Sequence, residues 1–319
     1  MRIEPLQAPV PAELSGMTFP AYRHLLNLKP VSRHPEQGDE RLVAPLGYVA
    51  WRGVSPVGLI LGELPVDSPE SPTTDVRTAY GGRPELLSVF VRADARWKGI
   101  AGQLFEAFEV GVRERGFGEI AATYMTGKAG IEGVERILAR RGWQAPQSRT
   151  LSLRLPLDKL LANPPLPRAA MSELARKLDI FPWSELSRAE LESLKQTQRE
   201  RPWIAPGLVP WKFEHGLDAS SLGARYEGNV VGWVLNHRVS ETVVRLTCAH
   251  MREDLSRWAM LAPVFYASLD RLAETPCQTC TFVTPFSYGT MIEAIQRYWV
   301  PIASSVSESR GTRLILSPE

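Results

Sequence analysis

The sequence has few cysteines, almost no excess charge and no long apolar run, and each shortage excludes a class of protein. Three cysteines among 319 residues do not suggest a scaffold held by disulfide bonds. A net charge of +2, from 37 basic and 35 acidic residues, gives no electrostatic case for nucleic-acid binding. No uninterrupted apolar run approaches the length of a membrane span, and residues 1–5 lack the core of a signal peptide. We therefore expect a soluble, cytoplasmic protein with no nucleic-acid or membrane partner.

The sequence does contain enough apolar material for sizeable cores. It is 44% hydrophobic and 23% charged, which is typical of a globular protein and not of a disordered chain. A length of 319 residues suits two domains of ordinary size.

The most informative stretch is residues 85–105. Its first part, Leu86 to Val91, is a short apolar run that predicts a buried strand. A helix is predicted from Gly99 onward, because apolar residues then recur at helical spacing. The turn between them, Arg96 to Gly102, is basic and carries two glycines. Small residues let the backbone approach a ligand, and a helix N-terminus offers free N–H groups, so the turn predicts a phosphate or pyrophosphate site.

This stretch resembles the acyl-CoA-binding motif of the GNAT acyltransferase superfamily. The family pattern is Arg or Gln, two variable residues, Gly, one variable residue, then Gly or Ala; here Arg96, Gly99 and Ala101 match it. The resemblance implies acetyl-CoA or a longer acyl-CoA as cofactor. The residues it implies for cofactor binding are Arg96, Trp97, Lys98, Gly99, Ile100, Ala101 and Gly102, with the N–H groups around Phe90 and Val91 on the thioester carbonyl and pantetheine arm. The alternative is an ordinary strand-to-helix turn.

The order of the predicted elements agrees with that resemblance. The predicted elements are, in order, a strand (3–6), a helix (11–28), a hairpin (47–61), a strand (86–91), a helix (99–116), a strand (120–125), a helix (131–141) and a strand (151–155). In the GNAT fold the strand before the motif and the strand after it diverge, and the thioester lies between them. The resemblance thus implies an α/β (α+β) fold.

The second half repeats the pattern of the first. Residues 222–235 are similar to residues 46–61, and strands and helices follow in the same order up to a final strand at Arg313–Leu316. We therefore expect two GNAT-like domains, residues 1–163 and 164–319, each a mixed, mostly antiparallel sheet flanked by helices. The second is interpreted as degenerate, because its turn, residues 250–255, has no glycine and places Glu253 and Asp254 where a phosphate would bind.

Two glutamates are candidates for the general base. Glu85 opens the strand before the motif, at the spacing at which some histone-acetyltransferase-like GNAT members place this base. The reaction needs a base because an alkyl amine, with a pKa near ~10.4, is mostly protonated at neutral pH. Glu63, just after the hairpin, is the alternative. Either residue could instead be a solvated carboxylate at the end of a strand.

The general acid is less clear. Many family members carry a tyrosine four residues before the glycine that ends the second motif helix, but here that position is Leu138, before Gly142. Tyr124, at the end of the neighbouring strand, is a possible substitute. The reaction can also proceed without an acid, because a thiol with a pKa near ~8.5 leaves tolerably as its thiolate.

Cys277-Gln-Thr-Cys280 has the spacing of a metal or redox motif. A zinc site needs two more ligands, and Cys248 with His250 are the candidates near it in sequence. In the expected fold these two pairs lie at opposite ends of parallel strands, so we interpret the cysteines as buried free thiols and expect no metal.

The acceptor is expected to be an amine-bearing small molecule or peptide. Asp67, Glu70 and Asp75 make the long loop before the motif acidic, which favours a cationic amine, although the loop could equally be an ordinary polar one. A longer acyl donor, as in GNAT-type maturases, and a non-catalytic acyl-CoA-binding module are the alternatives. The sequence does not indicate the oligomeric state.

Overall fold

Each of the two units contains its own run of hydrogen-bonded strands. The computed structural model describes residues 1–33, 41–66, 82–255 and 258–316. The chain divides into two units: the first comprises Met1–Arg149 with Ser309–Glu319, and the second comprises Thr150–Glu308. Both have the mixed, mostly antiparallel character that the sequence predicts. None of the helices in the described ranges is long and apolar enough to cross a membrane.

The sheet of the first unit has the order β1-β3-β4-β5-β6-β13, with β2 beside β3. Its strands are β1 (Arg2–Pro5), β2 (Val31–Arg33), β3 (Arg41–Arg52), β4 (Ser55–Pro65), β5 (Glu85–Val91), β6 (Glu119–Met125) and the end of β13 (Ser305–Ile315). Within it, β5 and β6 are parallel and the other neighbours run antiparallel. The expected hairpin is confirmed as β3 and β4.

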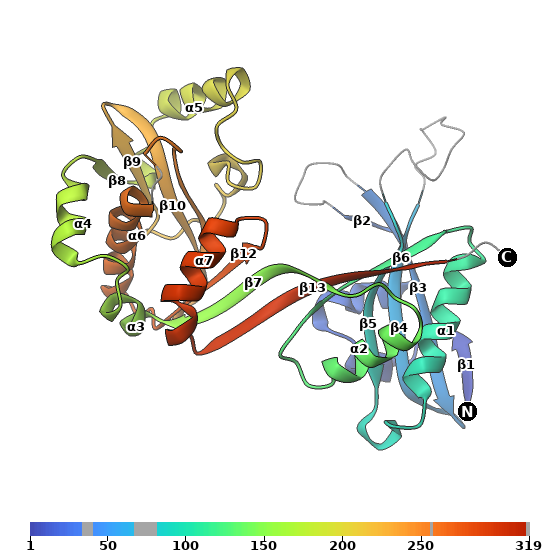
Figure 1. The fold of residues 1–319 in the computed structure, drawn as a ribbon. Helices are drawn as coiled ribbons and strands as arrows, with labels where there is room; N and C mark the ends of the chain where they lie inside the picture. Colours follow the sequence, from blue (N-terminus) through green and yellow to red (C-terminus); the bar gives the residue numbers. More distant parts are fainter. Residues whose placement is uncertain (34–40, 67–81, 256–257, 317–319) are drawn as a thin grey trace. The chain divides into compact units, whose positions relative to one another are not determined.

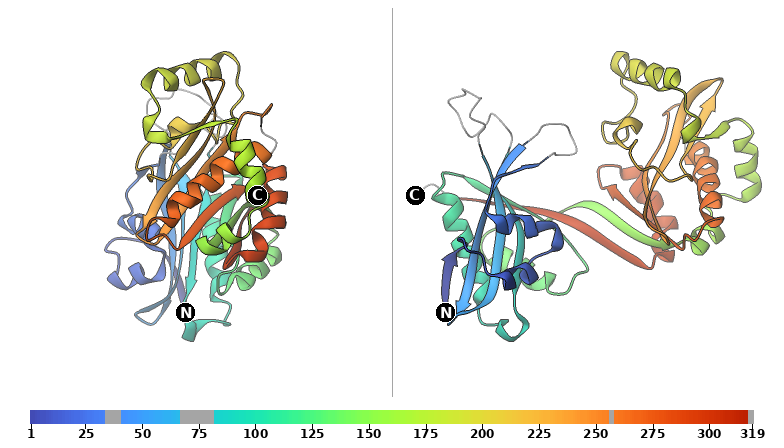
Figure 2. Two further views of the ribbon diagram at one scale, coloured as in Figure 1. Left: turned by 90° about the vertical axis from the view of Figure 1, so that its left-hand side faces the viewer. Right: turned by 180° about the vertical axis from the view of Figure 1, so that it is seen from behind.

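Helices cover both faces of this sheet (Figures 1 and 2). On one face, α1 (Ile100–Arg113) and α2 (Ile131–Arg140) form a core with the sheet, and the short η3 (Ala93–Ala95) precedes α1. On the other face lie two 3₁₀ helices, η1 (Ala12–Met17) and η2 (Pro20–Asn27). The prediction of one helix over residues 11–28 is wrong: Thr18 is extended, and Pro20, which cannot donate a helical hydrogen bond, starts a new segment.

The sheet of the second unit has the order β7-β12-β11-β10-β9-β8. Its strands are β7 (Gln147–Pro156), β8 (Asp179–Pro182), β9 (Leu222–Tyr226), β10 (Asn229–Ser240), β11 (Val243–Met251) and β12 (Thr279–Pro285). The helices are α3 (Leu157–Ala162), α4 (Arg168–Ala175), α5 (Arg188–Glu200), α6 (Trp258–Ala273) and α7 (Gly289–Tyr298), with short turns η4 (Trp183–Glu185), η5 (Pro210–Lys212) and η6 (Val300–Ile302).

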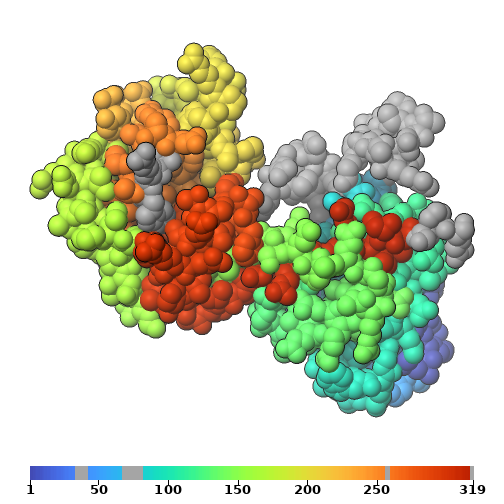
Figure 3. Space-filling view, in the orientation of Figure 1, coloured from blue at the N-terminus to red at the C-terminus, as the bar shows by residue number. Residues whose placement is uncertain are grey.

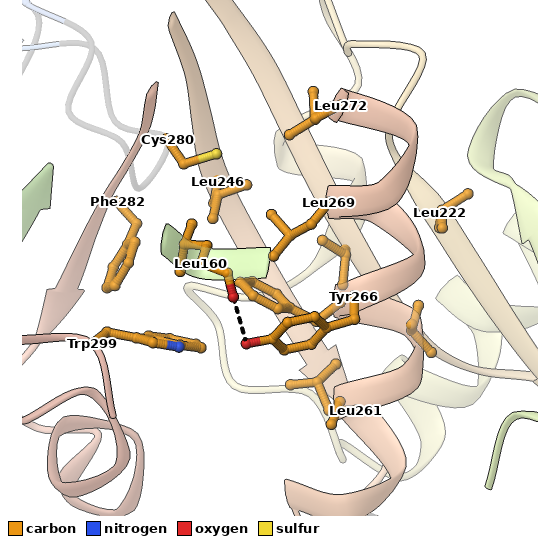
Figure 4. Close-up of a cluster of buried hydrophobic side chains, with 14 of the residues drawn as sticks. Leu160, Leu222, Leu246, Leu261, Tyr266, Leu269, Leu272, Cys280, Phe282 and Trp299 are labelled. Carbon is orange, nitrogen blue, oxygen red and sulfur yellow. Dashed lines mark hydrogen bonds between the residues drawn. The ribbon is translucent and has the colours of Figure 1, made fainter. Parts of the chain in front are cut away.

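The core of the second unit gathers around Tyr266 and Trp299 (Figure 4). The Tyr266 hydroxyl donates to the carbonyl of Leu160 at 3.3 Å, so the buried phenol is satisfied and joins α3 to α6. Phe265 stacks on Trp299 with 5.1 Å between ring centroids. A second cluster, on the face that carries α5, contains Trp183, Trp233 and Cys248.

The last strand of each unit comes from the opposite repeat. Residues 150–156 of β7 pair with β12 in the second unit, and residues 309–315 of β13 pair with β6 in the first. In Figure 3 the red atoms of the C-terminal segment accordingly lie among the green and cyan atoms of the first unit. The expectations that 151–155 closes the first unit and 313–316 the second are wrong, so the units differ from the expected ranges 1–163 and 164–319. Alternating hydrophobicity specifies which face of a strand is buried, not which strand lies beside it.

The internal repeat extends to individual residue pairs. In the first unit β4 meets β5 from Gly58 opposite Val91 to Glu63 opposite Glu85. In the second, β10 meets β11 from Gly232 opposite Met251 to His237 opposite Arg245. Each register contains one irregularity, which leaves Leu87 in the first unit and Thr247 in the second as the extra residue of a bulge. The predicted repeat is thereby confirmed at the level of strand register.

Candidate functional site

The candidate site lies where β5 and β6 separate. These parallel strands pair only at Glu85 with Ala121 and at Leu86 with Ala122. Beyond this point β5 continues to Val91 and β6 to Met125 without pairing to each other. The backbone on the facing edges is therefore available to a ligand between the strands.

The register decides which N–H groups of β5 face that gap. The N–H of Arg92 donates to the Val57 carbonyl on β4 at 2.9 Å. Because successive N–H groups of a strand point to opposite sides, that of Phe90 also faces β4, whereas those of Val89 and Val91 face the gap. Of the two predicted donors, the N–H of Val91 therefore faces the gap and that of Phe90 faces β4, while the N–H of Val89 also faces the gap.

The predicted anion-binding turn follows directly. Gly99 has φ +77°, a conformation that favours glycine, and α1 begins at Ile100. A side chain added at Gly99 or Gly102 would meet nothing within 4 Å, so the surface there is open. The first N–H groups of α1 lack partners within the helix. An open loop, free N–H groups and nearby cations fit a pyrophosphate.

The other residues of the motif have distinct positions around this turn. Arg96 Nε donates to the Val91 carbonyl at 3.0 Å, and Lys98 Nζ donates to the Asp94 carbonyl at 3.3 Å. The side chain of Ile100 is buried in the core, so its N–H group alone can face a ligand. Ala101, in the first turn of α1, is half-buried.

The two candidate bases are brought together. Glu63 on β4 and Glu85 on β5 are directly opposite each other, and cross-strand neighbours project to the same face with Cβ atoms about 4.5–5.5 Å apart. That face is the one covered by η1 and η2, because Leu61 and Leu59, which alternate with Glu63 along β4, pack into that cluster. Glu63 exposes 6% of its surface and Glu85 is half-buried. Sequence analysis treated the two residues as alternatives, and the strand register makes them neighbours.

Tyr124 lies on the opposite face. It packs against the core beneath α1 and α2, and its hydroxyl donates to Glu135 Oε1 at 2.9 Å. Arg310 of β13 donates to the same oxygen at 3.0 Å. Burial, with the Glu135 hydrogen bond, raises the pKa of Tyr124 well above its usual value. The hydroxyl therefore holds its proton, and the face that carries Tyr124 is not the face that carries Glu85.

Leu138, which occupies the usual position of the tyrosine acid, lies one turn of α2 after Glu135. Leu138, Glu135, Trp143 and Arg310 line a cavity of about 250 Å³. Through its hydrogen bond to Glu135, the Tyr124 hydroxyl is therefore next to the face of α2 that carries Leu138. That hydroxyl is already engaged as a donor to Glu135.

A buried network that the sequence reasoning missed fixes α1. Glu109 accepts from Arg141 Nε at 2.9 Å, from Arg141 Nη2 at 2.6 Å and from Trp143 Nε1 at 3.0 Å. Arg141 Nη1 also reaches the Gly102 carbonyl at 3.5 Å, at the anion-binding turn. One signal was available: Glu109 lies on the apolar stripe of α1, between Phe108 and Val112, where a carboxylate needs a buried partner.

The equivalent positions of the second unit carry different chemistry. His237 and Arg245 occupy the register positions of Glu63 and Glu85. The His237 ring lies between the Thr247 hydroxyl, 2.8 Å from Nδ1, and the His215 carbonyl, 3.0 Å from Nε2. Because a carbonyl can only accept, Nε2 carries a proton and donates it to His215.

One part of the sequence argument for a degenerate second unit, the acid at position 254, does not distinguish the two units. Continuing the register, Asp254 corresponds to Asp94 of the first unit, and each carboxylate binds the arginine two residues before it, Arg252 or Arg92. An acid at this position is therefore shared by both units and does not distinguish them. The same alignment pairs Ala93 with Glu253 and Gly99 with Ala259, so the second acid and the missing glycine are differences that remain.

The structure agrees with buried thiols. All three cysteines are free and buried. Cys280 is opposite Val244, where β11 and β12 are paired, whereas Cys248 lies beyond the last paired residue of β11, Arg245. Within the described residues no group of three or more metal-ligating side chains occurs. The acidic loop residues Asp67, Glu70 and Asp75 lie outside the described residues.

Comparisons with known proteins place the fold. The chain matches a tandem GNAT protein from the clavulanic acid biosynthesis pathway, solved without acetyl-CoA, at 14% identity and a TM-score of 0.54, over 98% of this chain and 90% of the other. It also matches a GCN5-related glucosamine N-acetyltransferase region of a fungal multi-domain GH3 β-N-acetylglucosaminidase at 14% identity and a TM-score of 0.51, over 85% of this chain and 33% of that one. No protein-family model and no curated protein sequence matches the chain. The predicted GNAT-like fold and its tandem arrangement are thus confirmed.

Proposed function

We propose that the first unit is an acyl-CoA-dependent N-acyltransferase that moves an acetyl or longer acyl group to an amine by direct transfer. One observation carries the proposal: β5 and β6 diverge between an open, glycine-bearing anion loop and a pair of facing carboxylates. A gap lined by free backbone N–H groups, with an anion site next to it and a base on one face, has the parts that acyl transfer from a thioester requires.

The chain's own residues supply identifiable steps. The turn at Gly99 and the start of α1 would hold the pyrophosphate, and Arg96 and Lys98 add positive charge. The N–H groups of Val89 and Val91 would bind the thioester carbonyl and stabilise the oxyanion that forms when the amine attacks. Glu85, with Glu63 beside it, would take the proton from the amine nitrogen. The carbon–sulfur bond then breaks, and the CoA sulfur leaves as a thiolate that takes a proton from solvent.

The acceptor is a primary amine on a small molecule or a peptide. A cationic ammonium group is attracted to the side of the sheet that carries Glu63 and Glu85, and loses its proton there before attack. This assignment is supported by the location of the carboxylate pair on the face opposite α1, so that the amine and the cofactor would reach the thioester from different sides.

The test is release of free thiol from acetyl-CoA, and then from longer acyl-CoA donors, across a panel of amines. Glu85→Gln should lower turnover by roughly 100- to 10,000-fold and leave CoA affinity nearly unchanged. The difference in turnover between wild type and Glu85→Gln should become smaller as pH rises toward the amine pKa, because the amine then loses its proton to solvent without a general base. Arg245→Gln, the register-equivalent change in the second unit, is the matched control. If the turnover of Glu85→Gln equals that of wild type at neutral pH, Glu85 is not the base and Glu63 becomes the candidate.

A non-catalytic acyl-CoA-binding module is the second candidate, and one observation favours it. The position of the usual tyrosine acid is Leu138, and the nearby Tyr124 hydroxyl is committed to Glu135. Saturable CoA binding without thiol release on any amine in the panel would support this module over the enzyme.

A further inference from the structure

The anion-binding turn carries an aromatic side chain that its backbone function does not explain. Trp97 lies between Arg96 and Lys98 and exposes 88% of its surface. Its φ is +63°, a left-handed conformation that costs a residue with a β-carbon about 1–2 kcal/mol. A glycine here would avoid both the exposed indole and the backbone cost, so the indole itself is the feature that needs a function.

One cation lies over this indole and two more, Arg96 and Lys98, are its neighbours in the chain. The Arg136 guanidinium, from α2, lies over the Trp97 ring with its carbon 5.9 Å from the ring centroid. Its Nε donates to the Glu132 carbonyl at 3.3 Å, which leaves its two terminal nitrogens for other acceptors. Among the described residues none of Arg96, Lys98 and Arg136 pairs with a carboxylate. The acid nearest in sequence, Asp94, is bound by Arg92 and Arg52.

An exposed indole with a guanidinium over its ring, and with Arg96 and Lys98 next to it in the chain, matches one end of coenzyme A. With the pyrophosphate on the turn, the pantetheine arm enters the gap between β5 and β6, and the adenosine 3′-phosphate is left on the outer side of the loop. Adenine offers a flat π face to an aromatic ring, and the 3′-phosphate offers a dianion to a guanidinium. Trp97 and Arg136 come from different elements, the loop before α1 and the middle of α2, so the match does not depend on the helix N-terminus alone.

We infer that Trp97 stacks on the adenine of the acyl donor and that Arg136 binds its 3′-phosphate, so that these two residues select coenzyme A over donors that lack adenosine. This inference rests on the proposed function. It assigns Trp97 a side-chain role in addition to its position in the motif.

The experiment is a calorimetric titration of the full-length chain with three ligands: CoA, dephospho-CoA, which lacks the 3′-phosphate, and 4′-phosphopantetheine, which lacks adenosine. Trp97→Gly removes the ring and tolerates the same φ. It should weaken CoA and dephospho-CoA alike, by about 5- to 150-fold, and leave 4′-phosphopantetheine unchanged. Trp97→Phe should retain most of the affinity. CoA should also quench indole fluorescence in wild type and not in Trp97→Phe.

Arg136 has its own arm of the experiment. Arg136→Gln should weaken CoA by roughly fivefold, as an exposed ion pair does, and leave dephospho-CoA unchanged. Arg140→Gln, one turn further along α2 and also exposed, is the matched control and should change neither.

Each outcome decides one claim. If wild type binds CoA and Trp97→Gly binds it as tightly, the inference is wrong while the proposed function stands. If Trp97→Gly weakens 4′-phosphopantetheine as much as CoA, Trp97 shapes the loop and does not bind adenine. If Arg136→Gln weakens both nucleotides equally, Arg136 does not bind the 3′-phosphate. If wild type binds no CoA at all, the inference and the proposed function fail together.

Discussion

The two units have the same strand register, but one equivalent position is packed by an apolar ring in the first unit and by hydrogen-bonded polar side chains in the second. In the first unit Gly62 lies opposite Leu86, and the space above it is filled by the ring of Phe108 from α1. In the second unit the register equivalent of Gly62 is Asn236, which is fully buried and donates to Ser268 of α6 at 2.8 Å and to Ser220 at 2.9 Å. The same position is thus filled by the Phe108 ring over Gly62 in the first unit and by Asn236 bonded to Ser268 in the second.

The two units also differ at the strand that lines the gap in the first unit. In the second unit the rings of His250, Trp203 and Trp233 pack against one another, with the His250 centroid 5.3 Å from Trp203 and 5.0 Å from Trp233. The Leu208 carbonyl accepts from Trp233 Nε1 at 3.2 Å and from Cys248 at 3.4 Å. The second unit thus packs its own chain against the strand whose first-unit equivalent carries the site. The two units share a strand register and differ at a few positions on β4, β5 and the turn before α1, which are the positions to which the proposed chemistry is assigned.

The largest effect is expected from removing residues 309–319, which separates the first unit from its last strand. Buried Leu314 and Leu316 would be lost, at about 2–5 kcal/mol each. That sum is comparable to the whole stability of many domains, about 5–15 kcal/mol. Hydrogen exchange should show loss of protection in β6 and retained protection in β12, whose partner β7 is intact.

A peptide of residues 305–316, added in excess, is the control for this truncation. It should restore protection of the β6 amides by pairing with the open edge. Full protection of β6 in the truncated chain without peptide would show that β13 is not required.

The comparison predicts one CoA site per chain. Gly99→Glu should abolish CoA binding, because it adds a side chain at φ +77° and a negative charge beside the phosphates. Ala259→Glu, the aligned change in the second unit, should leave affinity unchanged. Gly53→Glu, at a hairpin turn with φ +63° and equally open surroundings, controls for backbone strain and added charge. Calorimetric titration measures both affinity and stoichiometry, and two CoA molecules per chain would contradict the comparison.

The packing difference can be tested by exchanging its residues. Phe108→Ser should cost roughly 3–5 kcal/mol by leaving a cavity, and Gly62→Asn roughly 1–3 kcal/mol by overpacking against Phe108. The double variant reproduces the pair found in the second unit, so it should be more stable than the sum of the single changes predicts. A double-mutant cycle from denaturant unfolding measures this coupling, and strict additivity would show that the two sites do not share the space.

The smallest predicted effect concerns pH and the second unit. Burial lowers the pKa of His250 to about 4, because the charged ring is poorly solvated there. In the unfolded chain the pKa is about 6.5, so the unfolded state binds more protons between these values, and stability present above pH 6.5 is lost as pH falls toward 4. From pH 7 to pH 5 the loss amounts to about 2 kcal/mol.

His250→Phe tests this assignment by installing the residue found at the equivalent position, Phe90, of the first unit. The variant should lose about 2 kcal/mol less stability than wild type between pH 7 and pH 5, measured by denaturant unfolding at each pH. His215→Gln, at the surface, should behave as wild type. Identical acid sensitivity in wild type and His250→Phe would exclude His250 as the cause.

The sequence predicted the features that depend on neighbouring residues. The strand, turn and helix around Gly99 are confirmed, and so is the capping box of α5, where Ser187 Oγ accepts from the Glu190 N–H at 3.2 Å and the Ser187 N–H donates back at 2.8 Å. These structures are set by residues within a few positions of each other, which periodicity and turn chemistry detect.

The features that the sequence did not predict depend on distant partners. Glu135 of α2 accepts hydrogen bonds from both Tyr124 and Arg310, and Arg310 lies 175 residues after Glu135 in the chain. The partner of β6 is β13 and not β7, and no local pattern distinguishes two alternating strands of similar composition. The neighbouring positions of Glu63 and Glu85 follow from a register that includes a bulge at Leu87, which hydrophobicity alone does not locate.

The exchange of strands sets an order on synthesis. A ribosome makes β6 long before β13, because β6 ends at Met125 and the pairing part of β13 begins at Ser309. The nascent first unit therefore keeps an unpaired edge at β6 while the whole second unit is translated, and such an edge can pair with other chains. The wall of the gap that β6 forms is completed only when the last residues emerge. A chain whose translation stops early would thus carry every residue assigned to the anion loop and the carboxylate pair, and still lack a finished site.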